Sequence, residues 1–368
     1  MLMKRIVLLL YITGIFYACS SQDTKSYHIV NEIEIPYARR SGQFICNDSL
    51  FLFNAEPVSH KIINIYDCNG VKVKDISLKG LQYLEYTNSI EIINFDSVFI
   101  YIGTPCQYYY LIDSDGNIIN QRAIPREIKN DSLRVSLDAA ISNYYKGSIY
   151  FKRTVYPIAK EMGSGRARVR SNAYERVSPA YYKLCVNDSS ELQGYGENSF
   201  ENIYPNDSLY RESGKKYVCN GYLFFITDIY KILVFDLNVN KLVSVINLQS
   251  SFANETPNKD IIVTENNYET ILDNRPIIKD RGIVSGISYD AQTKQYYILL
   301  SLLNNPKSKY FIVQTFDKDF NFLREIKINE KGEARDICCF DGKIIVKCFK
   351  QNEKNNKSIV YKLYSVDF

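Results

Sequence analysis

The chain has 368 residues, of which 45 are basic and 41 acidic, so its formal net charge is +4. This basic excess is small and scattered along the sequence, which argues against a nucleic-acid partner. Hydrophobic residues form 46% of the chain and charged residues 23%, which is the balance of a globular protein rather than a disordered one. The chain is rich in tyrosine and phenylalanine, which together with isoleucine and valine favour strands. The composition therefore predicts an all-β globular protein.

Residues 1–18 have the pattern of a lipoprotein signal peptide. Two basic residues come first, and the apolar run 6–17 that follows is too short to span a bilayer as a stable helix. The run ends in a small residue followed by Cys19, which resembles a lipobox, where the cysteine is lipidated and becomes the first residue of the mature protein. An ordinary signal peptide with a chance cysteine is the alternative. We expect a lipid anchor at Cys19 as the contact with the membrane, and no spanning helix.

Residues 19–26 would then be the lipidated cysteine and a short polar tether. Ser20 follows the cysteine, and by resemblance to known sorting rules this argues against retention in the inner membrane. Acidic residues at this place mark surface export in Bacteroides-type lipoproteins, but Asp23 is alone here. We therefore expect an outer-membrane lipoprotein of the cell envelope, and the choice between its periplasmic and surface faces stays open.

The rest of the chain repeats a pattern of paired strands. Short turns rich in Asp, Asn and Gly, which tolerate the positive φ of tight hairpins, separate apolar runs. Six of the hairpins are predicted to be inner hairpins, at 43–53, 90–102, 139–152, 217–227, 286–300 and 336–349. Five outer hairpins alternate with them and turn at 67–70, 113–116, 187–189, 238–240 and 317–319.

The sixth outer position holds a single strand, 358–366, so the chain ends one strand short. The missing strand is available at 28–35, and its pairing with 358–366 would close the ring without an exposed edge. We expect residues 27–368 to form one domain, a six-bladed β-propeller closed by the N-terminal strand, since all-β domains can be this long. The alternatives are a seven-bladed propeller, with two more strands within 250–282, and a β-sandwich.

A lipobox, a short tether and blades of the kind seen at 110–119 (YLIDSDGNII) resemble the TolB-like, six-bladed β-propeller lipoproteins of unknown function in Bacteroides-type bacteria. The resemblance covers the whole mature chain and rests on architecture. It implies a fold and an envelope location, but no active-site residues.

Loop lengths distinguish two faces of the predicted propeller. Turns within hairpins are short and lie on one face. Links between hairpins and between blades lie on the other, and the long ones are 36–42, 54–61, 125–137, 154–179 and most of 249–282. Because such loops are uncommon unless they are functional or disordered, any ligand is expected on this face, near the channel mouth.

The link 154–179 carries Arg166, Arg168 and Arg170 at alternate positions, so an extended chain would direct all three guanidinium groups to one side. Guanidinium groups bind carboxylates, sulfates and phosphates. The alternative is a solvated loop whose charges face water.

Further candidate ligand-binding residues stand where the inner hairpins begin or within a long link. They are Arg39, Arg40, His60, Asp280, Arg281 and Arg335. Because the innermost strands line the channel, these residues would suit a polar or anionic ligand, and salt bridges between blades are the alternative.

Signatures of enzymes are mostly absent from the sequence. Two histidines, His28 and His60, allow neither H-E-x-x-H nor a three-His zinc site, and there is no G-x-S-x-G elbow. We expect no metal and no cofactor, and a non-catalytic role in binding a glycan, a peptide or a protein partner. Because a carboxylate pair across blades leaves no local motif, a propeller glycoside hydrolase or polysaccharide lyase is the alternative. The eight cysteines besides Cys19 form no C-x-x-C pair, which favours buried free thiols over disulfides.

Overall fold

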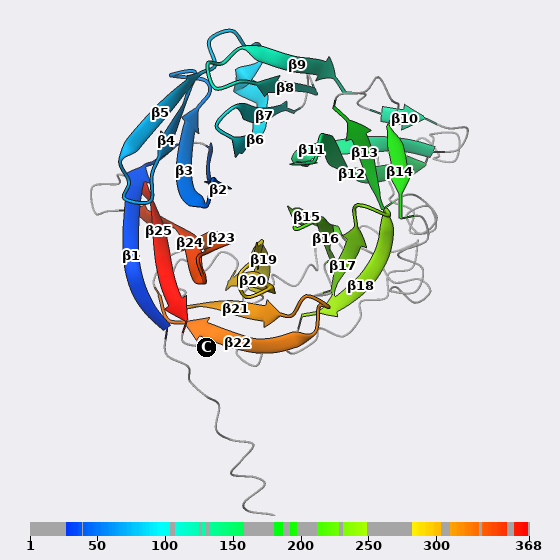
Figure 1. Cartoon of the computed structure of the whole chain (residues 1–368). Helices are drawn as coiled ribbons and strands as arrows, with labels where there is room; N and C mark the ends of the chain where they lie inside the picture. The colour runs from blue at the N-terminus through cyan, green and yellow to red at the C-terminus, as the bar shows by residue number, and fades with distance from the viewer. Residues whose placement is uncertain are drawn as a thin grey trace, which may run out of the picture.

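The computed structural model describes residues 27–38, 40–103, 107–124, 127–129, 133–157, 180–186, 192–196, 212–227, 231–248, 282–302, 310–330, 333–351 and 357–366. Their strands form six antiparallel sheets that stand around a common centre (Figure 1). The prediction of an all-β, six-bladed β-propeller is therefore confirmed. Most of 250–282, on which the seven-bladed alternative depended, lies outside the described residues.

The strands of each blade follow one another from the centre of the ring to the rim, except that blade 3 has an additional strand, β10, which lies away from the centre (Figure 1). Blade 1 contains β2 (Arg40–Cys46), β3 (Ser49–Glu56), β4 (Ile62–Tyr66) and β5 (Lys72–Ser77). Blade 2 contains β6 (Thr87–Asn94), β7 (Ser97–Ile102), β8 (Tyr108–Ile112) and β9 (Ile118–Ala123). Blade 3 contains β10 (Glu127–Lys129), β11 (Leu133–Tyr145), β12 (Ser148–Pro157), β13 (Tyr181–Cys185) and β14 (Gln193–Tyr195).

The second half of the ring has the same plan. Blade 4 contains β15 (Glu212–Cys219), β16 (Tyr222–Thr227), β17 (Lys231–Asp236) and β18 (Lys241–Asn247). Blade 5 contains β19 (Gly282–Asp290), β20 (Gln295–Leu302), β21 (Phe311–Phe316) and β22 (Phe322–Ile328). Blade 6 contains β23 (Glu333–Phe340), β24 (Lys343–Gln351), β25 (Lys357–Val366) and, at the rim, β1 (Tyr27–Pro36).

Blade 3 departs from the prediction at 125–137, which was expected to be a long link. The structure places a short hairpin there, in which β10 pairs with the start of β11 and Ile128 lies opposite Val135. Apolar and polar residues alternate on both sides of residues 130–132, which is typical of strands, so the expectation of a loop was wrong. The links 36–42, 54–61 and 154–179 are also shorter than expected, because β2 begins at Arg40, β3 extends to Glu56 and β12 extends to Pro157.

The N-terminal strand closes the ring. β1 pairs antiparallel with β25 from Tyr27, opposite Val366, to Pro36, opposite Ser358. The predicted pairing of 28–35 with 358–366 is thus confirmed. Ile33 and Ile35 of β1 are buried in the cluster between blades 6 and 1, so this strand contributes to the core as well as covering an edge.

The buried apolar side chains of the described residues form six clusters, and each lies between two neighbouring blades. Successive residues of one strand belong to clusters on opposite sides of the blade. In β16, Phe224 packs toward blade 5, whereas Leu223 and Phe225 pack toward blade 3. Strands covered on both faces need no polar side, which explains why runs such as YLFFIT are apolar throughout.

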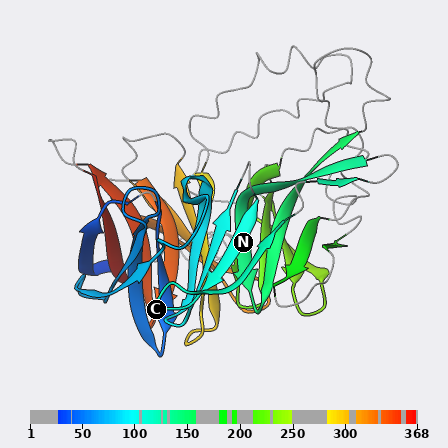
Figure 2. The same ribbon diagram turned by 90° about the horizontal axis from the view of Figure 1, so that it is seen from above.

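The connections fall on two faces of the ring. The antiparallel order places the hairpin turns on one, the short-turn face, and the links between hairpins and between blades on the other, the long-link face. Figure 2 shows the ring from the side, with the marked C-terminus toward the hairpin turns. In the part of the chain that the structure describes, no helix has the length and apolar character needed to cross a membrane.

Candidate functional site

The inner strands begin on the long-link face, and their ladders are irregular in five of the six blades. Register shifts occur in β6, β11, β15, β19 and β23. In β6, β19 and β23 the shift near the start of the strand inserts a single residue, namely Asn88, Ser285 and Arg335. Because a bulge re-aims side chains and is frequent beside functional sites, the channel mouth on this face is the first candidate site.

Three cations gather at the channel mouth where blade 6 meets blade 1. Arg40 begins β2, Arg335 is the inserted residue of β23, and Lys347 of β24 lies opposite Asp336. The pKa of Lys347 is lowered, mainly by burial. The Asp336 carboxylate acts against this and raises the pKa, whereas the guanidinium groups of Arg335 and Arg40 lower it further. The charges are thus close enough to act on one another, and the cations around Lys347 outnumber the carboxylate.

The same charged groups connect blade 6 to blade 1. Lys347 Nζ donates a hydrogen bond to the carbonyl oxygen of Ser41 at 2.7 Å. Gln43 Nε2 donates to Asp336 Oδ2 at 3.1 Å, and the other carboxylate oxygen of Asp336 accepts from the backbone N–H of Ile337. Both carboxylate oxygens of Asp336 therefore accept hydrogen bonds, and the bond to Ser41 fixes the direction of the Lys347 side chain.

The buried Tyr361 and the partly buried Tyr217 complete the surroundings of Asp336. The Tyr361 hydroxyl donates to the carbonyl oxygen of Gly42 at 2.9 Å, and the Tyr217 hydroxyl donates to that of Val284 at 3.3 Å. Burial raises the pKa of both tyrosines far above the usual value, and the charge of Asp336 raises it further. Both hydroxyls therefore stay protonated and serve as hydrogen-bond donors rather than as bases.

The two arginines of the channel mouth have different surroundings. Arg40 Nη2 donates to the carbonyl oxygen of Thr87 at 2.7 Å and so ties blade 1 to blade 2. The Arg335 guanidinium lies 5.5 Å from the centre of the Phe349 ring, a cation–π contact within its own blade, and its side chain is exposed. Arg335 is thus the arginine presented to solvent, whereas Arg40 has a structural contact.

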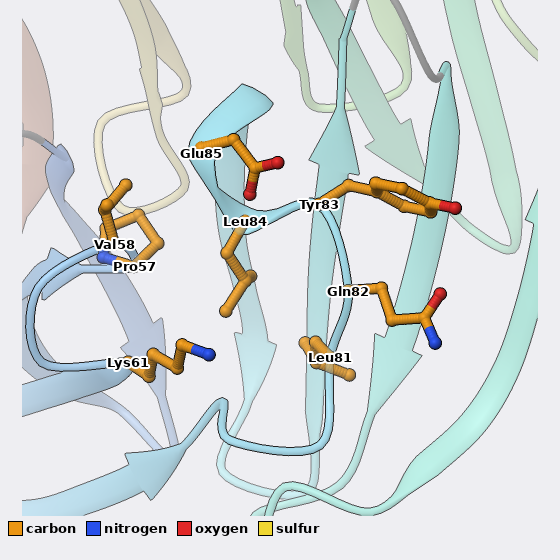
Figure 3. A pocket seen from close by; sticks show the side chains of 8 residues that line it. All are labelled: Pro57, Val58, Lys61, Leu81, Gln82, Tyr83, Leu84 and Glu85. Atoms are coloured by element: carbon orange, nitrogen blue, oxygen red, sulfur yellow. The ribbon is translucent and has the colours of Figure 1, made fainter.

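A pocket of about 480 Å³ lies on the same face between blades 1 and 2 (Figure 3). Its floor is apolar and consists of the buried residues Pro57, Leu81 and Leu84. Figure 3 shows the Lys61 ammonium and the Glu85 carboxylate pointing into it from different sides. A volume of this size suits a small molecule or one unit of a polymer.

The backbone around the pocket is strained. Lys61 has a φ of 50° and Tyr83 a φ of 60°, in the left-handed region that residues with side chains seldom adopt. Such strain concentrates at binding and catalytic sites, where the surrounding structure enforces it. His60 precedes Lys61, its side chain is exposed, and its backbone N–H donates to the carbonyl oxygen of Glu56 at 3.3 Å.

A second carboxyl group of the inner strands lies between blades 2 and 3. Glu91 Oε2 accepts the backbone N–H of Tyr144 at 2.9 Å. Burial raises the pKa of Glu91 to about 8, against the lowering effect of that hydrogen bond. The carboxyl group of Glu91 is therefore mostly protonated at neutral pH, and its hydrogen bond joins blade 2 to blade 3.

Of the predicted ligand-binding residues, the structure describes Arg40, His60 and Arg335. It brings Arg40 and Arg335 together at the channel mouth and places His60 beside the pocket of blades 1 and 2. The others lie outside the described residues, as does the predicted lipidation site: Arg39, Arg166, Arg168, Arg170, Asp280, Arg281 and Cys19.

Sequence reasoning missed Lys347, Gln43 and the pocket. A single lysine within the apolar run IIVKCF was a usable signal, because a charge between buried residues needs a partner. Among the described residues, no group of three His, Cys, Asp or Glu side chains could hold a metal ion. The cysteines at 46, 68, 185, 219, 338, 339 and 348 are free thiols.

Comparisons with known proteins identify no family for this chain. No family model matches the sequence, and no curated protein is significantly similar to it. Among solved structures, the β-propeller domain of Cps50 (Swd1) from Myceliophteria thermophila is similar, with a TM-score of 0.41 and 10% identity. The match covers 93% of this chain and 100% of that one, and it says nothing about function.

Proposed function

We propose that the protein is an envelope lipoprotein whose propeller binds an anionic ligand on its long-link face without catalysing a reaction. The observation that carries the proposal is the cation cluster of Arg40, Arg335 and Lys347 around one carboxylate, Asp336. A partly desolvated cluster of this kind attracts carboxylate, sulfate or phosphate groups more strongly than scattered surface charges do. An acidic glycan, an acidic peptide or an acidic surface of a protein partner supplies that chemistry.

Arg335 and Lys347 are the residues we assign to the ligand. Arg335 is exposed at a bulge, and Lys347 lies opposite Asp336 on the neighbouring strand. Lys347 bonds the Ser41 carbonyl with one of the three N–H groups of its ammonium, which leaves two for a ligand. Arg40 is assigned a supporting role, because its guanidinium ties blade 1 to blade 2 through the Thr87 carbonyl. The pocket beside Lys61 lies on the same face and offers a second contact for a ligand with an apolar part.

The anchoring part of the proposal rests on the N-terminal sequence. A signal peptide that ends at Cys19 and resembles those of TolB-like propeller lipoproteins would tether the domain to the outer membrane through residues 19–26. Because β1 begins at Tyr27 beside Val366, on the short-turn face, the binding face would point away from the tether. This arrangement keeps the long-link face open to large ligands.

The hydrolase alternative needs two carboxyl groups that share a substrate. Two carboxyl groups on inner strands, Glu91 and Asp336, each accept hydrogen bonds that join neighbouring blades. We therefore favour binding over hydrolysis.

The experiment that tests the proposal is a binding screen of the mature protein against acidic glycans and acidic peptides. Once a ligand is found, Arg335→Ala and Lys347→Met should each weaken binding about tenfold or more, since a charge-assisted hydrogen bond contributes about 1.5–3 kcal/mol. Lys318→Ala is the matched control, because Lys318 is an exposed cation in a hairpin turn on the opposite face. Equal losses for all three variants would contradict the assignment, as would a ligand affinity that does not fall with added salt.

A further inference from the structure

The outer strands repeat a feature of their own, which is a bulge occupied by an exposed aliphatic residue. Register shifts leave one extra residue in β5, β9, β18, β22 and β1. These residues, which we call the bulge ring, are Val73, Ile119, Val243, Leu323 and Val30, and they are 48%, 55%, 49%, 46% and 53% exposed.

The turn geometry fixes the position of the bulge ring. In blades 1, 2, 4 and 5 a residue with positive φ ends the outer turn, and the bulged residue comes three positions later. The turn residues are Gly70, Gly116, Asn240 and Phe320, with φ of 78°, 87°, 54° and 66°. In blade 6 the chain ends replace the turn, and Val30 comes three residues after Tyr27. In each of these five blades, the residue of the bulge ring therefore lies near the end of the outer strand that adjoins the short-turn face.

Edge protection alone does not account for these residues. A bulge does discourage edge-to-edge pairing, but proteins usually add lysine, proline or another charged residue to an exposed edge. Here valine, isoleucine or leucine occupies the same position five times, next to further exposed apolar side chains at Ile29, Val71, Ile118 and Phe322. Single exposed apolar residues are ordinary, whereas a repeated set along one side of a molecule marks an interaction surface.

We infer that the bulge ring rests on the surface of a lipid bilayer. This inference rests on the proposed anchor at Cys19. Tyr27 begins β1 on the same face, and only seven residues, 20–26, separate it from the acylated cysteine. The eight steps along the chain from Cys19 to Tyr27 span about 27 Å at most when fully extended, so the anchor holds this face close to the membrane. Aliphatic side chains brought there gain from burial in the interfacial region.

The charges of the short-turn face indicate which lipids it meets. Its turns carry the carboxylates of Asp48, Asp115 and Asp319, together with cations such as Lys318 and Lys343. Lys318 and Lys343 lie within 4.0 Å and 3.0 Å of the carboxylates of Asp319 and Asp341. A surface of paired charges and spare carboxylates suits zwitterionic lipids better than anionic ones.

The chain contains no tryptophan, which allows a direct test. The acylated protein carrying Leu323→Trp is reconstituted on phosphatidylethanolamine–phosphatidylcholine vesicles, and its fluorescence is compared with that of Tyr86→Trp. Tyr86 is exposed on the long-link face and serves as the matched control. We expect a blue-shifted emission and at least twofold stronger quenching by brominated lipids for Leu323→Trp, with the control unquenched. Part of the vesicle lipid is then replaced with phosphatidylglycerol, which should reduce the quenching.

The outcomes separate the bulge ring from the anchor. If both variants are quenched equally on vesicles that carry the protein, the bulge ring does not contact the lipid, although the proposed anchor still holds the protein on the vesicle. If the acylated chain does not float with vesicles, the anchor fails. In that case, excess vesicles are added to the two variants in solution. An emission of Leu323→Trp that does not shift also shows that the bulge ring does not contact lipid. Stronger quenching with phosphatidylglycerol overturns the assignment to zwitterionic lipid. Val73→Asp and Val73→Ser, made in the Leu323→Trp protein, should both weaken quenching, so that a folding defect in one variant does not decide the result.

Discussion

Closure of the ring by β1 predicts a stability loss that depends on which face of this strand is changed. Ile33 and Ile35 are 2% and 1% exposed and belong to the cluster between blades 6 and 1. Truncating one buried isoleucine to alanine costs about 2–5 kcal/mol, and the two side chains share one cluster, so their effects need not add. The double variant Ile33→Ala/Ile35→Ala should therefore lower the free energy of unfolding by about 4 kcal/mol or more, a large part of the roughly 5–15 kcal/mol that holds an ordinary domain together.

Urea unfolding of a protein that comprises residues 27–368 measures this loss. Far-UV circular dichroism is the suitable probe, because the chain lacks tryptophan. The control is Ile29→Ala/Val30→Ala on the same strand, whose side chains are exposed, and it should change stability by less than about 1 kcal/mol. If the control loses as much stability as the buried pair, or if the buried pair loses none, β1 does not close the ring as described.

Two further predictions concern the proposed anchor at Cys19 and the carboxyl group of Glu91. Cys19→Ala should release the protein from the membrane fraction or block its processing, and a variant that fractionates and migrates like the wild type would show that Cys19 is not lipidated. Burial raises the pKa of Glu91 to about 8 in the folded protein, so the unfolded chain gives up this proton first as the pH rises. The free energy of unfolding of the wild type should then fall between about pH 4.5 and pH 8, by up to about 1.4 kcal/mol per pH unit from this group. Glu91→Gln should lack that fall in urea unfolding at pH 5, 6, 7 and 8, and a parallel decline in both proteins would assign it to another group.

The features that the sequence predicted well are those built from local interactions. Asp67, Asp113 and Asp317 each accept the backbone N–H groups two and four residues later, which holds the outer turns in shape. These turns need only a few neighbouring residues, so their spacing alone indicated the order of the strands. The unpaired last strand then required a partner, and the N-terminal run supplied it.

The features that the sequence did not reveal depend on register and on distant contacts. A bulge such as that at Arg335 or Val73 adds one residue to a ladder without changing the kinds of residue on either side. Lys347 bonds the Ser41 carbonyl, 306 positions away, and no local pattern indicates such a pairing. The hairpin at 127–137 was visible in the alternation of its residues, but the length of the segment suggested a loop.

The pairing of Tyr27 with Val366 also orders the events of folding. The strand that is synthesised first among those described is needed last, because its partner β25 is the final strand of the chain. Until β25 arrives, Ile33 and Ile35 have no blade 6 to pack against, and the edge of β1 is open to other chains. Contacts of such sequence separation form slowly, so the chain is exposed to aggregation for as long as the ring is open. The adjacency of the two ends also makes this protein suited to circular permutation, since a turn joining 366 to 27 would restore the hairpin that the other outer strands possess.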